Sequence, residues 1–429
     1  MKSHLSIAIG WLVAVFSTAC SGQQIQITSE RPSGIYALGE QVSWHVHVLG
    51  PAAASVAQAN YVLKEDGYTV MSQGTLDLSS GSAELDTSLN DPGTILCIVT
   101  ANAGDDSQRV LAGAAIAPDQ IQPCAPPPDD FDDFWARKVS ELEQIPADPK
   151  LEPADSGDPR VQYFKITMNN IHGSHIYGQL ARPAADGKFP ALLITQWAGV
   201  YGLPKYRVVD PARQGWLALN IMPHDIPFDR PDDYYKQLFA TSLKNYWTFG
   251  SADRDSSYFL RMYLSCYRAA EYLSQRPDWD GKTLVVMGTS QGGQQAIMLG
   301  GLFPGITAVL ANVPSDCDMT GPLHGRAIGY PNWADQAALE HNPKILETGR
   351  YYDPINFARH IKCPALIAMG LIDETSPPAG VLAAANQIKG REIVIMPNSN
   401  HQGDHNGQAP FNRRSEQWLN ALRDGKPLP

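Results

Sequence analysis

A serine at position 290 has the sequence context of a nucleophile. Residues 288–292 read GTSQG, and they follow the apolar run Thr283–Met287 and precede an apolar helical segment. A strand, a tight turn between glycines and a helix are together typical of the nucleophile elbow, which holds a serine hydroxyl clear of the backbone near a helix N-terminus. Gly288 and Gly292 would let the strand and the helix approach closely. The alternative is a glycine-rich turn with a buried serine, and the strand–turn–helix context favours the nucleophile.

Two later loops supply the base and the acid that such a serine needs. Asp373 follows the apolar run Ala365–Met369, and His401 follows Glu392–Met396. The order Ser, acid, His is the one that accompanies this elbow, and both loops leave the carboxyl ends of strands, where open α/β sheets place their sites. His405 is the rival base, and His401 is favoured because it lies closer to the strand end. The alternative roles are a turn residue for Asp373 and a surface residue for His401.

An acyl-transfer site also needs hydrogen-bond donors for the oxyanion of the tetrahedral intermediate. The backbone N–H of Gln291, next to the nucleophile, is the first candidate. The second is expected in the loop after Ala191–Thr195, whose small residues suit close approach to a carbonyl oxygen. We predict the N–H of Ala198.

The elements that must position these residues alternate between apolar strands and helical segments from about residue 160. Continuous apolar runs indicate strands covered on both faces, so residues 131–429 are expected to form a mostly parallel sheet with helices on both faces, an α/β fold. The strand candidates are Ala191–Thr195, Gly215–Ile221, Thr283–Met287, Ala308–Val313, Ala365–Met369 and Glu392–Met396.

The preceding residues, 24–118, are expected to form a small all-β, immunoglobulin-like sandwich. Val42, Trp44 and Val46 alternate with polar residues, and the Asp66-Gly67 pair separates two β-rich runs as in a hairpin. Two histidines of one strand, at 45 and 47, have no third ligand nearby in the sequence, so we predict no metal site. Residues 119–130 contain four prolines and predict a stiff linker. The sandwich is expected to act as a spacer or a positioning module.

The N-terminus has the pattern of an export signal. Lys2 precedes the apolar run Ile7–Phe16, which is too short to span a bilayer as a helix, and small residues follow up to Cys20. Residues 1–19 are therefore a predicted lipoprotein signal with a lipid anchor at Cys20, and ordinary cleavage near Ala19 is the alternative. The expected location is the periplasm or the outer membrane, or otherwise the outside of the cell.

Composition narrows the classes of partner. The 429 residues are 43% hydrophobic and 18% charged, which is a globular composition. The 33 Lys and Arg against 44 Asp and Glu give a net charge of −11, so nucleic acid is not an expected partner.

Residues from about 129 to 425 resemble the acetyl xylan esterase / cephalosporin-C deacetylase family, carbohydrate esterase family seven. The resemblance implies an α/β-hydrolase that removes acetyl groups from xylo-oligosaccharides and small acetyl esters. It places the triad on Ser290, Asp373 and His401 and oxyanion donors on Gln291 and near Ala198, and the mechanism requires no cofactor. The matching pieces are Asp132 to Trp135, Gly288 to Gly293, Val313-Pro314, Cys317-Asp318, Tyr352-Asp353, Asn356 to Ala358, Lys362 to Pro364, Gly370 to Asp373, Pro377-Pro378 and Pro397 to His401.

The sequence departs from the family pattern around the expected pocket. Where the family has Arg-Gly-Gln, residues 223–225 read PHD, and where it has His-Gly, residues 196–197 read QW. We predict that His224, Asp225 and Trp197 contact the substrate, with a loop-fixing role for His224 and Asp225 as the alternative. Gln402 replaces the usual Glu after the triad histidine. The specificity for the acyl group and for the sugar therefore stays open. A homo-oligomer also stays an open possibility, since an added N-terminal domain alters the packing surfaces.

The function predicted is an exported serine esterase that removes acetyl groups from acetylated oligosaccharides or polysaccharides such as xylan. Two alternatives remain. One is a broader esterase or a peptidase with the same machinery. The other is a glycan-binding protein with an inactive hydrolase scaffold.

Overall fold

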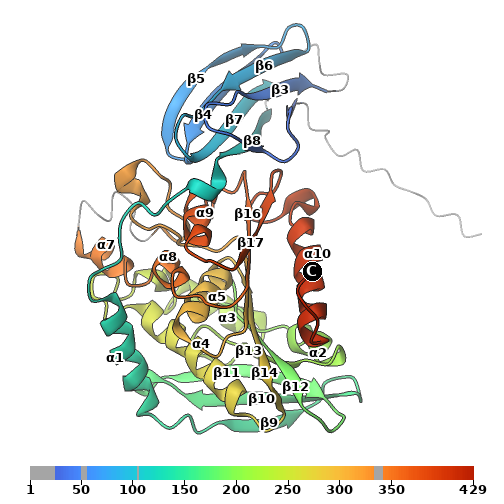
Figure 1. Ribbon diagram of the computed structural model, residues 1–429, viewed down its shortest axis with the longest axis vertical. Coiled ribbons are helices and arrows are strands. Elements are labelled where there is room, and N and C mark those ends of the chain that lie inside the picture. The colour runs from blue at the N-terminus through green and yellow to red at the C-terminus, as the bar shows by residue number, and fades with distance from the viewer. Residues whose placement is uncertain (1–24, 50–55, 104–105, 333–341) are drawn as a thin grey trace, which may run out of the picture.

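The computed structural model describes residues 25–49, 56–103, 106–332 and 342–429. The predicted signal, residues 1–19, and the predicted lipidation site Cys20 lie outside these ranges. Within them, no helix combines the length and the apolar character that crossing a membrane requires. Figure 1 shows a small β part at one end of the molecule and a larger part in which helices flank a sheet.

The small part consists of two facing sheets, in the range predicted for a sandwich. One has the order β1 (Ile25–Ser29), β3 (Val42–Val48), β6 (Ser82–Thr87). The other has the order β2 (Ile35–Tyr36), β8 (Asp106–Ile116), β7 (Gly93–Ala103), β4 (Gln58–Glu65), β5 (Thr69–Asp77). Trp44 and Val46 from the first sheet and Cys97 and Val99 from the second are fully buried in one core. The immunoglobulin-like assignment remains a prediction.

The large part is built on a nine-stranded sheet with the order β17-β16-β15-β14-β12-β13-β11-β10-β9. The strands from β13 to β17 in this order run parallel, whereas β11, β10 and β9 are antiparallel to their neighbours. The sheet is therefore mostly parallel, as predicted, with an antiparallel edge that the apolar runs did not indicate. Its strands are β9 (Lys150–Ala154), β10 (Val161–Asn169), β11 (His175–Pro183), β12 (Phe189–Ile194), β13 (Leu217–Ile221), β14 (Trp279–Thr289), β15 (Ala308–Asn312), β16 (Ala365–Gly370) and β17 (Arg391–Met396).

Helices cover both faces of this sheet, which explains the uninterrupted apolar strands. Along β12, Leu193 packs into the core beneath α4 and α5, while Leu192 packs beside Phe411 and Trp418 of α10. One face carries α1 (Phe131–Glu143), α4 (Tyr258–Gln275), α5 (Gln291–Leu302), α8 (Pro354–Ala358) and α9 (Pro378–Asn386), and the other carries α2 (Tyr206–Arg213) and α10 (Ala409–Arg423). The remaining helices are α3 (Asp232–Ala240) and α7 (Lys344–Gly349), with single 3-10 turns at η2 (Pro118–Gln120), η3 (Ile171–Gly173), η4 (Tyr246–Thr248), η5 (Gly321–His324) and η6 (Asp404–Asn406).

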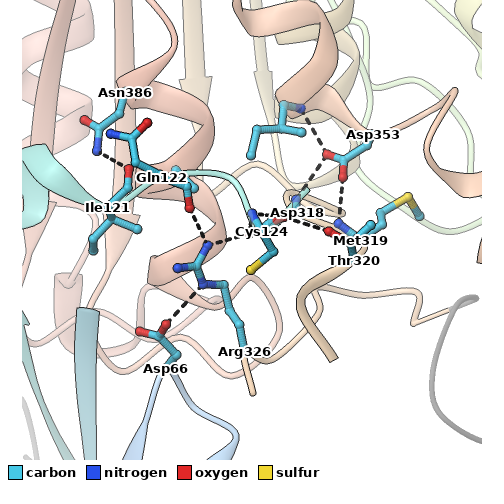
Figure 2. A network of polar contacts seen from close by, with 12 residues as sticks. Asp66, Ile121, Gln122, Cys124, Asp318, Met319, Thr320, Arg326, Asp353 and Asn386 are labelled. Atoms are coloured by element: carbon cyan, nitrogen blue, oxygen red, sulfur yellow. Dashed lines mark hydrogen bonds and ion pairs between the residues drawn. The ribbon is translucent and has the colours of Figure 1, made fainter. Parts of the chain in front are cut away.

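A buried arginine ties the two parts together (Figure 2). Arg326 Nε lies 3.1 Å from Asp66 Oδ2 in the β4–β5 turn, and its Nη1 donates to Asp318 Oδ2 at 2.5 Å and to Gln122 O at 2.9 Å. Asp66 belongs to the sandwich, Asp318 to the loop after β15 and Gln122 to the linker. One guanidinium therefore fixes three segments that are far apart in the sequence.

The linker follows the surface of the large part. The N–H of Cys124 donates to the Asp318 carboxylate at 3.2 Å, and Asn386 Nδ2 donates to the carbonyls of Pro118 and Ile121, each at 2.8 Å. Residues 119–130, predicted as a stiff linker, are thus held by side chains of the large part (Figure 2).

We expect Arg326→Met to lower the free energy of unfolding by about 3–5 kcal/mol, because it leaves the carboxylates of Asp66 and Asp318 buried without a counter-charge. Lys236→Met is the matched control, since Lys236 pairs with Asp233 on an exposed surface and such a pair contributes less than ~1 kcal/mol. Chemical unfolding of the two variants measures the difference. Equal losses would contradict the structural role of Arg326.

Candidate active site

Ser290 occupies a strained turn between β14 and α5. Its φ of 58° and ψ of −125° lie where non-glycine residues are rare, as in a nucleophile elbow. A Cβ on Gly288 would lie 2.2 Å from Gly292 O, and a Cβ on Gly292 would lie 2.9 Å from Thr195 O. The predicted reason for the two glycines is therefore present in the structure. The turn is held by the N–H of Ser290, which donates to Asn312 O of β15 at 2.9 Å.

The structure brings Ser290, His401 and Asp373 into one hydrogen-bonded chain. Ser290 Oγ lies 2.9 Å from His401 Nε2, and His401 Nδ1 lies 2.9 Å from Asp373 Oδ2. The buried carboxylate accepts, so Nδ1 carries the proton in the neutral ring and Nε2 is left to accept the serine proton. His405, the rival base, is exposed in η6 and is not part of this chain.

The acid is fixed by its own loop. Asp373 Oδ1 accepts from the N–H groups of Thr375 at 2.8 Å and Ser376 at 2.7 Å. A Cβ on Gly370 would lie 2.0 Å from Ser399 O, so the acid loop and the histidine loop pack backbone against backbone. Any shift of the acid loop would thus change the distance between Asp373 and His401.

A cavity of about 540 Å³ opens over Ser290. The predicted residues Trp197 and Ala198 line it, together with side chains that no motif had indicated. Those are Phe239 of α3, Tyr330, Thr375 and Gln408. Gln408 donates to His401 O at 2.7 Å and accepts from Asn312 Nδ2 at 2.8 Å, so it links the histidine loop to β15. Phe239 is 41% exposed, and no pattern in the sequence around it indicated that it joins the cavity.

The two predicted oxyanion donors come from two segments, the start of α5 and the loop after β12. Gln291 is the first residue of α5, so its N–H has no acceptor within the helix. The Gln291 side chain is buried and accepts from Tyr246 OH at 2.7 Å, which fixes the start of the helix. Ala198 belongs to the loop that lines the cavity. Their role as donors stays a prediction.

His224 is not among the residues that line the cavity, contrary to its predicted contact with substrate. It is 1% exposed, and its Nε2 donates to Gly199 O at 2.9 Å while Nδ1 lies 2.7 Å from Tyr258 OH. A carbonyl only accepts, so in the neutral ring Nδ1 accepts from the tyrosine. His224 therefore supports the Trp197–Gly199 loop from behind, the alternative left open by the sequence.

Asp225 is also absent from the cavity lining. Its side chain is exposed and lies 3.9 Å from His175 Nδ1. The chain turns between residues 224 and 225, and this places one side chain inside and the other on the surface, away from the predicted substrate contact.

The arrangement can perform acyl transfer with protein groups alone. A hydroxyl lies beside an imidazole oriented by a carboxylate, next to a helix N-terminus. In the part of the chain that the structure describes, no three His, Cys, Asp or Glu side chains are grouped to hold a metal ion.

The chain is similar to proteins of known family and known structure. The model of the family Acetyl xylan esterase (AXE1) matches residues 119–422. Acetyl esterase Axe7A of Xylanibacter ruminicola is 32% identical over 375 residues, which span 86% of this chain and 84% of that protein. Acetyl xylan esterase 1 from Thermoanaerobacterium sp. JW/SL YS485 superposes with a TM-score of 0.60 at 21% identity, over 71% of this chain and 97% of its own. An acetyl xylan esterase from Paenibacillus sp. R4 gives a TM-score of 0.60 at 24% identity, over 71% and 98%. The predicted α/β-hydrolase fold is confirmed.

Buried His224 predicts a pH-dependent stability. Burial lowers its pKa from 6.5 to about 4, so between these values the unfolded chain binds a proton that the folded chain does not. The free energy of unfolding should therefore fall as the pH drops through this window, by up to roughly 3 kcal/mol from this group.

We expect His224→Gln to reduce the slope of stability against pH between pH 4 and 6.5, measured by urea unfolding. Ser274→Ala, which removes no titratable group, should keep the wild-type slope, and an unchanged slope in His224→Gln would refute the assignment.

Proposed function

The chain belongs to the acetyl xylan esterase family and is a carboxylic-ester hydrolase, and from this premise we propose that it removes acetyl groups from acetylated oligosaccharides or polysaccharides such as xylan. The observation that carries the proposal is the hydrogen-bonded chain from Asp373 through His401 to Ser290 at the base of an open cavity. It lies within the residues that match the family.

The proposed reaction has two steps. His401 Nε2 takes the proton from Ser290 Oγ as that oxygen attacks the acetyl carbonyl carbon, and Asp373 holds the imidazole and stabilises its charged form. The N–H groups of Gln291 and Ala198 stabilise the oxyanion, each by about 3 kcal/mol in the transition state. His401 then donates its proton to the departing sugar oxygen. Water, deprotonated by the same histidine, attacks the carbonyl carbon of the acetyl-serine, and the histidine returns this proton to Ser290 Oγ as the ester bond breaks and acetate leaves.

The cavity supports a substrate with both polar and apolar surface. Trp197 and Phe239 present exposed aromatic surface, and Gln402, Gln408 and Thr375 add hydrogen-bonding groups. Aromatic side chains with polar neighbours suit a sugar, which has apolar C–H surface and hydroxyls. Longer acyl esters or peptides, handled by the same machinery, are the second candidate. The intact hydrogen-bonded triad argues against an inactive glycan-binding scaffold.

We expect Ser290→Ala to lower kcat for p-nitrophenyl acetate by roughly 10⁵-fold or more, and Asp373→Asn by roughly 10⁴-fold. Ser274→Ala, on α4 away from the cavity, should retain wild-type activity. Full activity in Ser290→Ala would disprove the mechanism.

The substrate class is tested by acetate release from a panel of acetylated glycans, with a series of p-nitrophenyl esters of increasing chain length beside it. Acetate release from acetylated xylan and a strong preference for the acetyl ester are expected. Comparable rates on the octanoyl ester would favour the broader esterase.

The proposed location outside the cytoplasm follows from the N-terminal sequence alone. When the chain is expressed in a bacterium fed labelled palmitate, the wild-type chain should carry the label and appear in the membrane fraction, because lipid is attached to the cysteine that follows a lipoprotein signal, here Cys20. Cys20→Ser should remove the label. An unlabelled wild-type chain in the soluble exported fraction would favour ordinary cleavage.

A further inference from the structure

The sandwich touches the loop that carries the proposed catalytic acid. Gly113 lies in the middle of β8, where its backbone faces residue 371 of the large part. A Cβ on Gly113 would lie 2.3 Å from Leu371 O and 2.6 Å from Leu371 Cβ. Both are closer than atoms approach without displacement, and one of them belongs to the backbone. The two backbone segments therefore meet so closely that a side chain at position 113 has no space.

The Leu371 side chain is enclosed by the same surface. It is 2% exposed, and a Cβ on Gly34 of the sandwich would lie 2.6 Å from its Cδ1. Gly34 is itself fixed to β8, because the N–H of Ala115 donates to its carbonyl at 2.8 Å. Leu371 is thus an apolar anchor that holds the acid loop against the sandwich.

A second contact between the sandwich and the acid loop involves Glu374, the residue after Asp373. Arg109 of β8 forms a bidentate ion pair with Glu374, with both N···O distances at 2.7 Å. A small cavity of about 50 Å³ separates Asp373 from Thr94 and Ile95 of β7. The sandwich therefore contacts residues 371 and 374, on either side of Asp373, and strand β8 takes part in both contacts.

The large part holds the loop from the opposite side. The N–H of Leu371 donates to Met396 O at 3.1 Å, and the N–H of Tyr330 donates to Thr375 O at 2.7 Å. Because Asp373 Oδ1 is held by two amides of its own loop, the carboxylate moves with that loop. A displacement at Leu371 is consequently passed to the bond between Asp373 and His401.

We propose that Gly113 of the sandwich is a positioning residue for Asp373, so that the N-terminal sandwich completes the active site as the outer wall of the acid loop. The inference rests on the proposed catalytic role of Asp373. It goes beyond the predicted role of a spacer or positioning module, because it assigns the sandwich a part in turnover of small substrates that never reach beyond the cavity.

Gly113→Ala tests the proposal in the full chain with p-nitrophenyl acetate. The added methyl displaces Leu371, so kcat is expected to fall by roughly tenfold to a hundredfold while KM changes little. Gly74→Ala is the matched control. Gly74 lies on the outer strand β5 of the same sheet, where an added Cβ meets the Tyr61 ring at 3.0 Å, and it should retain the wild-type kcat. Circular dichroism and the unfolding midpoint show whether each variant is folded.

A double variant separates positioning from general damage. In the Asp373→Asn background the acid no longer functions, so Gly113→Ala should add little further loss. An equal loss of kcat in both backgrounds, or a wild-type kcat in folded Gly113→Ala, would overturn the proposal. If Asp373→Asn alone retained full activity, the catalytic mechanism itself would be wrong, which is a separate outcome.

Discussion

The hydrogen bond between His401 and Asp373 depends on two loops whose backbones touch at Gly370 and Ser399. These loops leave the carboxyl ends of the neighbouring parallel strands β16 and β17, and Ser290 follows β14 at the same edge. The sheet therefore brings the three groups to one edge, and close backbone packing sets their final distances. Glycine appears where two backbones meet, at 288 and 292 under the elbow and at 370 under the acid, because any side chain would separate the elements.

The loop after β15 connects this edge of the sheet to the rest of the molecule. The N–H of Ser315 donates to Ser290 O at 3.2 Å, and three residues later Asp318 accepts from Arg326. Asp353 accepts from the N–H groups of Asp318 and Met319, and burial raises the pKa of Asp353 to about 7 (Figure 2). The motifs Cys317-Asp318 and Tyr352-Asp353, which carry part of the family resemblance, thus have a structural role. They hold a loop that contacts Ser290 at one end and the polar contacts of Arg326 at the other.

Local patterns predicted the triad and the parallel strands because both are encoded over short stretches. Apolar runs mark strands buried on both faces, and polar residues just after them mark the active edge. Strands β9 to β11 lack such runs and were missed, since β9 is largely exposed and β10 and β11 carry polar residues among their apolar ones. The sequence could not show which side of its loop His224 faces, nor that Phe239 and Tyr330 join the cavity, because both depend on how distant segments fold back. The contact between Gly113 and Leu371 has no sequence signal at all, since each looks ordinary in its own segment.

The burial of Leu371 against the sandwich also has a consequence for the order in which the protein is made. A chain emerges with its N-terminal residues first, from the ribosome or across a membrane, and domains generally fold as units as they emerge. The sandwich can therefore be complete before residues 370–376 emerge, so the acid loop docks on a finished surface rather than forming one. A hydrolase part made without the sandwich would leave this leucine in water, with one wall of its loop missing.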